Sequence, residues 1–560
     1  MSKKRNGDRK TSLGKLLKMS KREKERSALH STITRIANNM WGTLGSWDFN
    51  EYVLGFLFYR FISKNLSSYI KSDTSDKFDF DYADWSDSTA KCRVNEIIKE
   101  KGFFILPSQL FENVCREAPN NENLHITLRD IFKNIEDSAE LPVVDRASIK
   151  GLLSNLDVNS SKMGLTTEEC NKKLVKLLQA IGDLPIGRYE NNDSIDLLGD
   201  AYEYLMTMTM YTRSSGKSRG EFFTPHEVSE LLARLTVIGK KKVGNVYDPA
   251  CGSGSLLLKF AKVLGKENVR GGFYGQEINP TTYDLCRMNM FLHNIEREKI
   301  HIALGDTLMG SEHGYHKGLY KARPPGEAPK YGYYSLFEAE AIVSNPPFST
   351  EWNNEVPWIV NDPRFTPARA LAPKSKSDLA FVMHSLYYLS DNGTAAIVLF
   401  PGVMYREGKE QKIRKYLVDN NYVDAVIQLP GDLFFSTSIA TCILVMKKNR
   451  PDNRVLFIDA SKEFECVNNK HKLGDKNIKK ILDCYAGRET CNYFSRLVGY
   501  KEIEDKNYNT SVGTYVDPED TREVVDIKKL NAEIDQIVAR QGELRSQIDA
   551  IVAELEGGAT

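Results

Sequence analysis

Between about residues 210 and 460, short apolar runs alternate with longer segments in which apolar residues recur every three or four positions. The short runs predict buried strands and the longer segments predict helices with one apolar face. Strands are expected at residues 243–247, 272–275, 341–343, 395–400 and 424–427, and helices over 228–235 and 256–261. This alternation favours an α/β fold. Two further runs, 442–445 and 455–458, are expected to form an antiparallel hairpin at the sheet edge.

The region that precedes this segment shows helical spacing without the short runs. Three groups of apolar and aromatic residues, starting from about residue 29, predict a separate all-helical N-terminal domain. The groups are Tyr52, Phe56, Tyr59 and Leu66, then Leu152, Leu153 and Leu156, then Ile195, Leu198, Tyr202 and Leu205.

Beyond about residue 520 the apolar residues follow alternating spacings of three and four, which predicts a coiled-coil-type helix. The seam contains Ile527, Leu530, Ile534, Ile537, Gln541, Leu544, Ile548, Ile551 and Leu555. Its length and terminal position favour an interface with a partner, and a helix that packs on its own domain is the alternative. The polar Gln541 would set register or partner choice at some cost in stability.

These patterns divide the 560 residues into five parts. The parts are a basic arm (1–28), a helical N-terminal domain (29–200), an α/β domain (201–465), a connecting region (466–520) and a C-terminal helix for subunit assembly (521–560). The arm carries eleven Lys and Arg against three acidic residues, and we expect it to be disordered. A solubilising role is favoured, and contact with phosphates is the alternative. Because the whole chain has a net charge of +1, the remainder carries −7.

The composition narrows the class of protein. It is that of an ordinary globular protein, with 41% hydrophobic and 27% charged residues. The apolar stretch 54–69 is interrupted by Arg60 and Lys64, and no signal-peptide pattern opens the chain, so we expect a cytoplasmic protein without a membrane span. The nine cysteines form no Cys-x-x-Cys pair and there is no His-Glu-x-x-His sequence, so neither a disulfide framework nor a metal site is indicated.

A glycine-rich turn, Asp-Pro-Ala-Cys-Gly-Ser-Gly at 248–254, joins the first predicted strand to a helix. Gly252 and Gly254 let backbone N–H groups approach a polar ligand closely. A dinucleotide site would need a third glycine at position 257, where the chain has Leu257. Glu277 follows the second strand, where a carboxylate is placed to accept hydrogen bonds from the ribose of an adenosyl cofactor. The alternative interpretation is an ordinary turn between a strand and a helix, without a ligand.

A second motif, Asn345-Pro346-Pro347-Phe348, follows the strand at 341–343, whose end faces the same crevice. The Asn345 side-chain oxygen and the Pro346 carbonyl would accept hydrogen bonds from an exocyclic amino group and favour its nucleophilic form, on a backbone that the prolines preorganise. Phe348 would stack on a base rotated out of the duplex. A proline-rich turn with a core phenylalanine is the alternative. The order of the two motifs is that of amino-group methyltransferases.

From about residue 29 to its C-terminus the chain resembles the modification (methyltransferase) subunit of type I restriction-modification systems. The resemblance implies a Rossmann-like domain that uses S-adenosylmethionine. It also implies that the segment 221–226 closes over the methionine part of this cofactor and that Asp306 reaches its adenine. Read from the residues alone, Thr224-Pro225 is a helix cap and Asp306 is equally well a turn residue.

The candidate site residues divide into two groups. Those for catalysis are Asn345, Pro346, Pro347 and Phe348. Those for the cofactor are Glu221, Phe222, Phe223, Thr224, Pro225, His226, Asp248, Ala250, Gly252, Ser253, Gly254, Ser255, Glu277, Ile278, Asn279 and Asp306. Asp378 is expected to cap a helix rather than act in catalysis. Residues 310–334 are expected to form a surface loop, either facing DNA or a mobile insertion.

The leading hypothesis is methylation of the 6-amino group of adenine in DNA. Chemistry alone leaves the 4-amino group of cytosine open, and adenine follows from the resemblance. Because no segment after the α/β domain is large enough for a DNA-reading domain and the folded part is slightly acidic, partner subunits must help to bind double-stranded DNA. The resemblance implies two modification subunits on one specificity subunit, joined by a restriction (motor-nuclease) subunit. The alternatives are a protein glutamine amide methyltransferase and a non-catalytic scaffold that binds cofactor.

Overall fold

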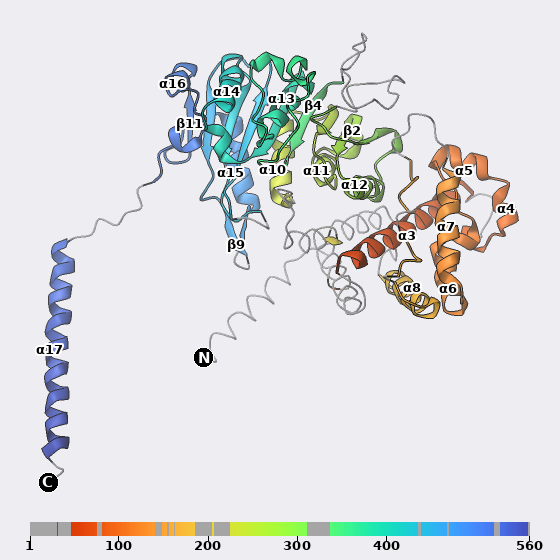
Figure 1. The fold of residues 1–560 in the computed structure, drawn as a ribbon, viewed down its shortest axis with the longest axis horizontal. Coiled ribbons are helices and arrows are strands. Elements are labelled where there is room, and N and C mark those ends of the chain that lie inside the picture. The colour runs from red at the N-terminus through yellow and green to blue at the C-terminus, as the bar shows by residue number, and fades with distance from the viewer. Residues whose placement is uncertain are drawn as a thin grey trace. The chain divides into compact units, whose positions relative to one another are not determined.

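The computed structural model describes a helical part, an α/β part and a C-terminal helix (Figure 1). The described residues are 46–74, 81–139, 148–153, 156–161, 163–184, 224–310, 337–434, 438–467, 470–519 and 527–557, together with Ser31, Tyr204 and Leu205. The chain separates into two compact units, Met1–Val516 and Asp517–Thr560. The predicted basic arm and nearly all of the predicted loop at 310–334 lie outside the described residues.

The helical part is built around one long helix, α3, in which most of the apolar side chains between Tyr52 and Ile70 are buried. Tyr59 of α3 makes edge-to-face contacts with Phe111 and Phe132, at ring-centroid distances of 5.5 and 5.3 Å. Such aromatic pairs add specific geometry to the burial of apolar area. The helices are α3 (Ser46–Thr74), α4 (Asp87–Lys91), α5 (Val94–Lys101), α6 (Phe111–Glu117), α7 (Leu124–Ser138) and α8 (Thr167–Gly182), with short 3₁₀ turns between them.

The helix predicted around Tyr52–Leu66 is confirmed. The helical spacing at Leu152, Leu153 and Leu156 predicted wrongly, because these residues lie in bends and irregular backbone, although their side chains are buried in the same core. Ile195, Leu198 and Tyr202 of the third group lie outside the described residues.

The α/β part contains a nine-stranded sheet in the order β11-β8-β6-β7-β5-β4-β1-β2-β3. Its strands are β1 (Val243–Asp248), β2 (Val269–Glu277), β3 (Ile300–Leu304), β4 (Ala339–Ser344), β5 (Leu389–Leu399), β6 (Val423–Gln428), β7 (Cys442–Lys447), β8 (Val455–Asp459) and β11 (Ser495–Val498). The pairs among β3, β2, β1, β4 and β5 are parallel, and β7 is antiparallel to both β5 and β6. All five strands predicted for the sheet are confirmed.

Helices cover both faces of the sheet (Figure 1). One face packs against α10 (His226–Val237), α11 (Ser255–Leu264) and α15 (Asp475–Gly487), and the other against α13 (Asp378–Tyr388), α14 (Lys409–Asp419) and α16 (Tyr500–Asp505). Successive strand residues enter opposite cores, as β4 illustrates: Ala341 and Val343 lie in the first and Ile342 in the second. The strands are apolar on both faces because both faces are covered.

Two sequence predictions about the part of the sheet formed by β7, β8 and β11 are wrong. The runs at 442–445 and 455–458 do not form an edge hairpin, because β7 pairs with β5 and β6 while β8 pairs with β6 and β11. The region 466–520 is not merely connecting. It contains the hairpin β9 (Glu465–Val467) and β10 (Lys470–Lys472), then α15, β11 and α16, and β11 completes the sheet.

Helix α12 (Pro280–Leu292) belongs to two cores at once. Leu285, Met288 and Leu292 pack in the core of the helical part, whereas Cys286 and Met290 pack in the α/β core. Phe291 lies 6.2 Å from Phe58 of α3, centroid to centroid, and the Arg287 guanidinium donates to the carbonyls of Ser148 and Lys150. The helical part and the α/β part are thus packed together through this helix.

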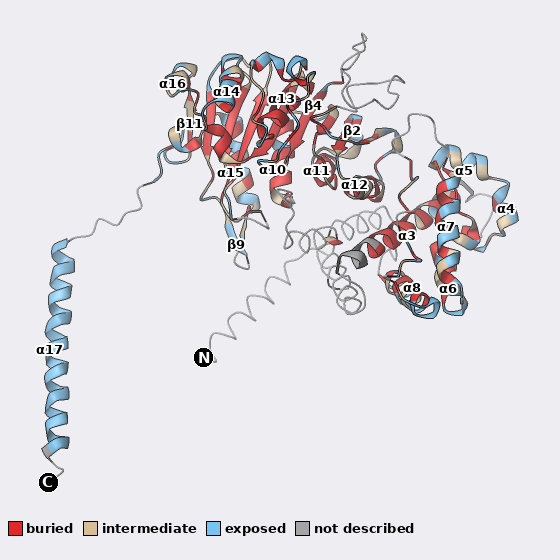
Figure 2. Ribbon diagram, viewed as in Figure 1, coloured by how far each residue is buried: buried red, intermediate tan, exposed pale blue. Residues whose placement is uncertain are grey.

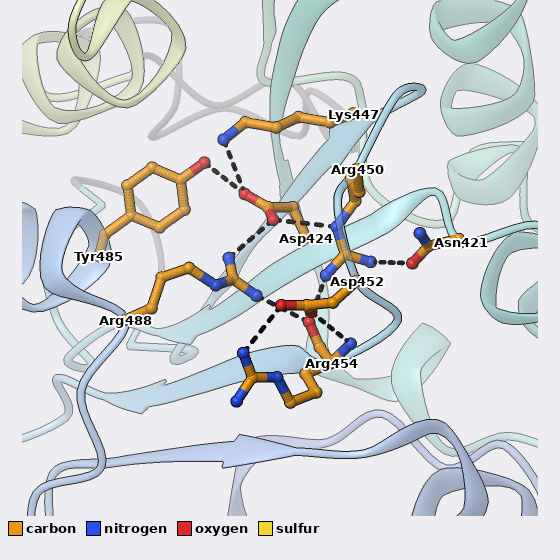
Figure 3. A network of polar contacts seen from close by, with 8 residues as sticks. All are labelled: Asn421, Asp424, Lys447, Arg450, Asp452, Arg454, Tyr485 and Arg488. Carbon is orange, nitrogen blue, oxygen red and sulfur yellow. Dashed lines mark hydrogen bonds and ion pairs between the residues drawn. The ribbon is translucent and has the colours of Figure 1, made fainter.

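The edge of the sheet at which β6 begins and β7 ends holds a buried polar network (Figure 3). The Asp424 carboxylate contacts Lys447 Nζ at 3.1 Å, Arg450 Nε at 3.1 Å and Arg488 Nη1 at 2.8 Å, and it accepts a hydrogen bond from the Tyr485 hydroxyl at 2.6 Å. The side chains of Asp424 and Arg450 are only 4% and 2% exposed. Three cations and a phenol therefore compensate one buried carboxylate.

The second unit contains helix α17 (Ile527–Gly557), which is exposed along its described length (Figure 2). All apolar residues of the predicted seam lie on it, with exposed fractions from 47% for Leu530 to 72% for Leu555. The predicted C-terminal helix is confirmed. Among the described residues, no helix is long and apolar enough to cross a membrane.

Candidate functional site

Two predicted motifs meet where the strand order of the sheet reverses. From β1 the chain continues outward through β2 and β3, and then returns to β4 on the other side of β1. The parallel strands β1 and β4 pair Tyr247 with Ile342, so the segments that begin at Asp248 and Asn345 leave the sheet at the same edge. Ligands of open α/β sheets bind at such a switch point, outside the carboxyl ends of the strands.

The glycine-rich turn needs its glycines for two different reasons. Gly252 and Gly254 have positive φ angles of 52° and 78°, which side-chain-bearing residues rarely adopt. A Cβ atom at Gly254 would lie 2.7 Å from Cys286 Sγ of α12, so this glycine allows close packing. A Cβ atom at Gly252 would meet nothing within 4 Å among the described residues, so open space lies beside the turn there.

Glu277, the last residue of β2, connects this turn to the start of α12. Its Oε2 accepts a hydrogen bond from the Gly252 N–H at 3.1 Å, and its Oε1 accepts one from the Asn279 N–H at 2.8 Å. Asn279 in turn caps α12 by accepting from the Thr282 N–H at 3.2 Å. The neighbouring Ile278 is 63% exposed. A carboxylate and an exposed apolar side chain thus stand next to the open side of the turn.

Asp248, the last residue of β1, is buried with an incomplete set of hydrogen bonds. It is 1% exposed, and its Oδ1 accepts from the Ala250 N–H at 3.0 Å. Its Oδ2 has no hydrogen-bond partner among the described residues. Burial raises the pKa of Asp248 to about 7; the Ala250 N–H and the nearby Ser344 hydroxyl oppose the shift, and the negative charge of Glu277 adds to it. A buried carboxylate of this kind suits a ligand that brings a positive charge.

Asn345 joins the catalytic motif to a segment far away in the sequence. Its Nδ2 donates to Thr224 Oγ1 at 3.0 Å, across a separation of 121 residues. The predicted cap is wrong in detail, because the N-cap of α10 is Pro225 and the Thr224 hydroxyl binds Asn345 instead of the helix. His226 is the first residue of α10. Glu221, Phe222 and Phe223 lie outside the described residues.

The rest of the catalytic loop is held by contacts on both sides of Phe348. The half-buried Phe348 ring meets Phe434, which follows β6, edge to face at 6.4 Å between centroids. Ser349 has a positive φ of 49°, and its N–H donates to both carboxylate oxygens of Asp378, at 3.2 and 3.1 Å. These contacts fix the loop directly after Pro346 and Pro347.

Asp378 differs from the helix cap that the sequence suggested. The N-cap of α13 is Ser377, which makes no side-chain capping bond, and Asp378 is the first helical residue. Burial raises the pKa of Asp378, and the Ser349 N–H opposes the shift. The carboxylate therefore clamps the catalytic loop.

Asp306 forms a turn after β3. Its Oδ1 accepts from the Leu308 N–H at 2.9 Å, and its backbone carbonyl accepts from the Gly310 N–H at 3.0 Å. The turn interpretation is confirmed, and contact with a cofactor adenine stays a prediction. The next residue, Thr307, donates from Oγ1 to the Pro249 carbonyl at 2.5 Å. This bond ties the segment after β3 to the glycine-rich turn.

Two family models match the chain and together span most of it. Residues 193–524 match N-6 DNA Methylase, and residues 29–181 match the HsdM N-terminal domain. The methylase subunit of the type I restriction enzyme MpnII from Mycoplasma pneumoniae is 47% identical over 546 residues, which cover 96% of this chain and 98% of the relative. The chain belongs to the N-6 DNA methylase family, as a type I modification subunit.

More distant relatives of this type I modification subunit agree. The methylase subunit of MjaVII from Methanocaldococcus jannaschii is 32% identical over 371 residues, 65% of this chain and 59% of the relative. A crystal structure of the type I restriction-modification methyltransferase subunit from Streptococcus thermophilus superposes with a TM-score of 0.75 and 30% identity, covering 88% of this chain and 100% of that chain. The resemblance predicted from the motifs is confirmed. The prediction that the protein is an adenine-specific DNA methyltransferase is confirmed with it. Neither alternative function receives support.

Several residues that organise the methylase site were missed by sequence reasoning. Asn289 of α12 is fully buried and donates from Nδ2 to the Ser253 carbonyl at 2.9 Å. Gln276 of β2, also fully buried, donates to the Gly310 carbonyl at 2.9 Å. A polar residue within an otherwise apolar helix face or strand is the signal that was available. Asp378 and Thr307 gave no such signal, because their partners lie 29 and 58 residues away.

Proposed function

We propose that this type I modification subunit methylates the 6-amino group of adenine in DNA with the residues gathered at the ends of β1, β2 and β4. The Asn345–Thr224 hydrogen bond is the observation that carries this assignment of residues. It joins the Asn-Pro-Pro-Phe motif to the segment expected to close over the cofactor, next to the glycine-rich turn. The reacting amino group and the methyl donor would then meet between two adjacent strands.

S-adenosylmethionine fits the residues around the turn. The open side of Gly252 leaves room for a ligand, Glu277 would accept hydrogen bonds from ribose hydroxyls, and the buried Asp248 would favour a cationic group. Ile278 and Asp306 would contact the adenine ring and its amino group. When bound, this cofactor supplies an electrophilic methyl group on a positively charged sulfur. The protein residues themselves bind, orient and exclude water.

The target amino group would be activated by two fixed acceptors. Because Asn345 Nδ2 donates to Thr224, the orientation of the amide is set and Oδ1 is the atom that would accept from the amino group. The Pro346 carbonyl would be the second acceptor. An amino nitrogen that donates to two acceptors is held pyramidal, with its lone pair directed outward and able to attack. Since the loop is already clamped by Asp378, little reorganisation accompanies the reaction.

Phe348 would form one wall for a base rotated out of the duplex. Its edge-to-face contact with Phe434 holds the ring while leaving it half-buried. Stacking on an aromatic side chain contributes about 1–3 kcal/mol per base. Adenine, rather than cytosine, is the base on which the family acts. We place the reaction in the cytoplasm, where cellular DNA would be reached.

Assembly would occur through α17. Its apolar seam is exposed, and the chain without its first 28 residues carries a net charge of −7, so the subunit is poorly suited to bind DNA alone. We propose that α17 docks on a specificity subunit, that two modification subunits share one specificity subunit, and that a restriction subunit joins the complex. Gln541 would select the register of this contact.

The catalytic assignment is tested by Asn345→Ala in the complex reconstituted with the specificity subunit. Loss of a preorganised acceptor should lower the turnover of DNA methylation by about 10²–10³-fold, with cofactor affinity nearly unchanged. Transfer of labelled methyl groups to DNA measures the first quantity and calorimetry the second. Near-normal turnover would contradict the role of Asn345. Labelling of protein instead of DNA by the wild-type complex would contradict the substrate.

The assembly proposal is tested separately by ending the chain before Ile527. Since residues up to Val516 form a compact unit without α17, the shortened chain should fold and bind S-adenosylmethionine. It should fail to co-purify with the specificity subunit and should lose sequence-specific methylation. Co-purification at full strength would show that another surface holds the complex together.

A further inference from the structure

Arg364 is a buried arginine whose five N–H groups all have partners. It lies in the loop between β4 and α13 and is 5% exposed. Its Nε donates to Asp362 at 3.0 Å, and its Nη2 donates to the same carboxylate at 2.7 Å and to the Leu308 carbonyl at 2.9 Å. Its Nη1 donates to the Thr307 carbonyl at 2.7 Å and to His384 Nδ1 at 3.0 Å. The planar guanidinium thus fixes three segments in one geometry.

The acceptors of Arg364 belong to the segment that carries Asp306. The carbonyls of Thr307 and Leu308 follow Asp306 directly, and the Leu308 N–H closes the turn on the Asp306 side chain at 2.9 Å. Through Thr307 Oγ1 and the Pro249 carbonyl, 2.5 Å apart, the same contact extends to the glycine-rich turn. Arg364, which belongs to none of the sequence motifs, therefore holds the backbone segment that positions Asp306.

The opposite side of Arg364 is equally rigid. Because His384 Nδ1 accepts from the guanidinium, it carries no proton. The His384 ring therefore holds its hydrogen on Nε2, which donates to the Tyr247 hydroxyl at 2.9 Å. His384 and Tyr247 are fully buried, on α13 and β1 respectively. The loop that follows the catalytic motif is anchored in this way to the same two elements that support the motif and the turn.

We propose that Arg364 is a positioning residue of the methyltransferase, which holds the segment from Gly305 to Gly310 in the shape that receives the cofactor adenine. The proposal deepens the proposed function and rests on its assignment of Asp306. A lysine in place of Arg364 would keep one positive charge but would offer a single nitrogen, so it cannot serve both carbonyls, the carboxylate and the imidazole together. Misplacement of a binding segment lowers binding even when every ligand-contacting residue is still present.

Arg450 provides a matched control. Its guanidinium is also buried and also pairs with an aspartate, but at the other edge of the sheet (Figure 3). Arg364→Lys and Arg450→Lys are therefore compared in the full-length protein. Both exchange a buried guanidinium for an ammonium group, and only the first touches the segment after β3.

Three measurements test the proposal. Hydrogen exchange of the peptide that covers 304–310 should become about tenfold faster or more in Arg364→Lys without any ligand, and should not change in Arg450→Lys. The Kd of S-adenosylhomocysteine, measured by calorimetry, should rise about tenfold or more in Arg364→Lys alone. In the reconstituted complex the KM for S-adenosylmethionine should rise while kcat changes much less.

The outcomes separate this proposal from the proposed function. Unchanged exchange and unchanged affinity in a folded Arg364→Lys protein would overturn it, and so would equal losses of affinity in both variants. If wild-type protein fails to bind S-adenosylhomocysteine, the cofactor assignment is wrong, whereas the exchange measurement still tests whether Arg364 holds the segment. If Arg364→Lys does not fold, Asp362→Asn, which weakens the hold on the guanidinium, is judged by the same criteria.

Discussion

Two buried aspartates of the same sheet, Asp248 and Asp424, have opposite surroundings. Asp248 lies at the carboxyl end of β1, and Asp424 lies near the amino end of β6. Asp424 contacts Lys447, Arg450 and Arg488 and accepts from Tyr485. Burial alone would raise its pKa, but these partners hold the pKa of Asp424 below its ordinary value. Asp248 accepts one backbone N–H, and burial raises its pKa to about 7. The fold compensates the Asp424 carboxylate with cations, whereas it offers Asp248 only the Ala250 N–H and the nearby Ser344 hydroxyl.

This difference distinguishes a buried carboxylate that stabilises the fold from one that destabilises it and belongs to a binding site. A buried ion network that satisfies its charges belongs to the architecture of the sheet. A buried acid with an unfilled hydrogen-bonding position opposes folding when it ionises, and such groups gather at binding sites. The edge with Asp424 is therefore interpreted as structural, and the edge with Asp248 as the place where a ligand completes the charge balance.

The largest expected effect is a loss of stability when the network around Asp424 is disrupted. Asp424→Ala removes the anion that faces Lys447, Arg450 and Arg488 and leaves their charges uncompensated. The free energy of unfolding should fall by about 3–5 kcal/mol, as when one partner of a buried ion pair is removed. Denaturant unfolding followed by fluorescence measures it. Cofactor affinity of the folded protein should stay unchanged, and a protein that keeps its stability would show that the network is not structural.

The second effect concerns Glu277, on the functional side. Glu277→Ala should weaken S-adenosylmethionine binding by about 1.5–3 kcal/mol, because hydrogen bonds to a charged acceptor are lost. Glu277→Gln is the matched control, since it keeps the shape and one acceptor oxygen and should lose less. Calorimetry compares the two variants. Equal affinity of Glu277→Ala and wild type would exclude contact with the ribose.

The smallest expected effect is a pH dependence set by Asp248. Below its pKa of about 7 the carboxyl is neutral, and above it the carboxylate can face a cation. If the ionised form binds the positively charged cofactor, affinity should rise by about tenfold between pH 6 and 8 and then level off. In Asp248→Asn this rise should disappear. Calorimetry at three pH values measures both proteins, and a parallel rise in the variant would assign the titration to another group.

The same group makes a matching prediction for stability. Because the pKa of Asp248 is raised in the folded state, ionisation opposes folding, and its unfavourable contribution grows as pH rises from about 4 to 7. Asp248→Asn should therefore stabilise the cofactor-free protein more at pH 8 than at pH 5. Thermal unfolding at both pH values provides the measurement. Identical differences in Tm at the two values would show that Asp248 does not titrate in this range.

The sequence predicted the sheet and the site where chemistry and local pattern coincide. A strand followed by Asp-Pro-Ala-Cys-Gly-Ser-Gly, or by Asn-Pro-Pro-Phe, locates both the end of an element and its polar groups. It predicted β7 and β8 as strands but failed for their pairing, because an apolar run reveals burial but not which strand lies next to it. It failed for β11, whose four residues carry too little pattern.

The contacts of Arg364 and Asp378 could not be predicted from the sequence for a different reason. Each is a charged residue in or beside a loop, where exposure is the usual expectation. Their burial results from segments that come together only in the folded chain, such as Ser349 against Asp378 and Leu308 against Arg364. Contacts of this kind depend on three-dimensional proximity, which single-sequence patterns do not contain.

Helix α12 also limits which domains could be exchanged by recombination during the evolution of this protein. Its Leu285, Met288 and Leu292 complete the core of the helical part, while Cys286 and Met290 support the turn at Gly254. A recombination event that joined this α/β domain to a foreign helical domain would have to preserve the side chains that face both sides of the helix. The two domains, although separate in sequence, are expected to accumulate substitutions together across this helix.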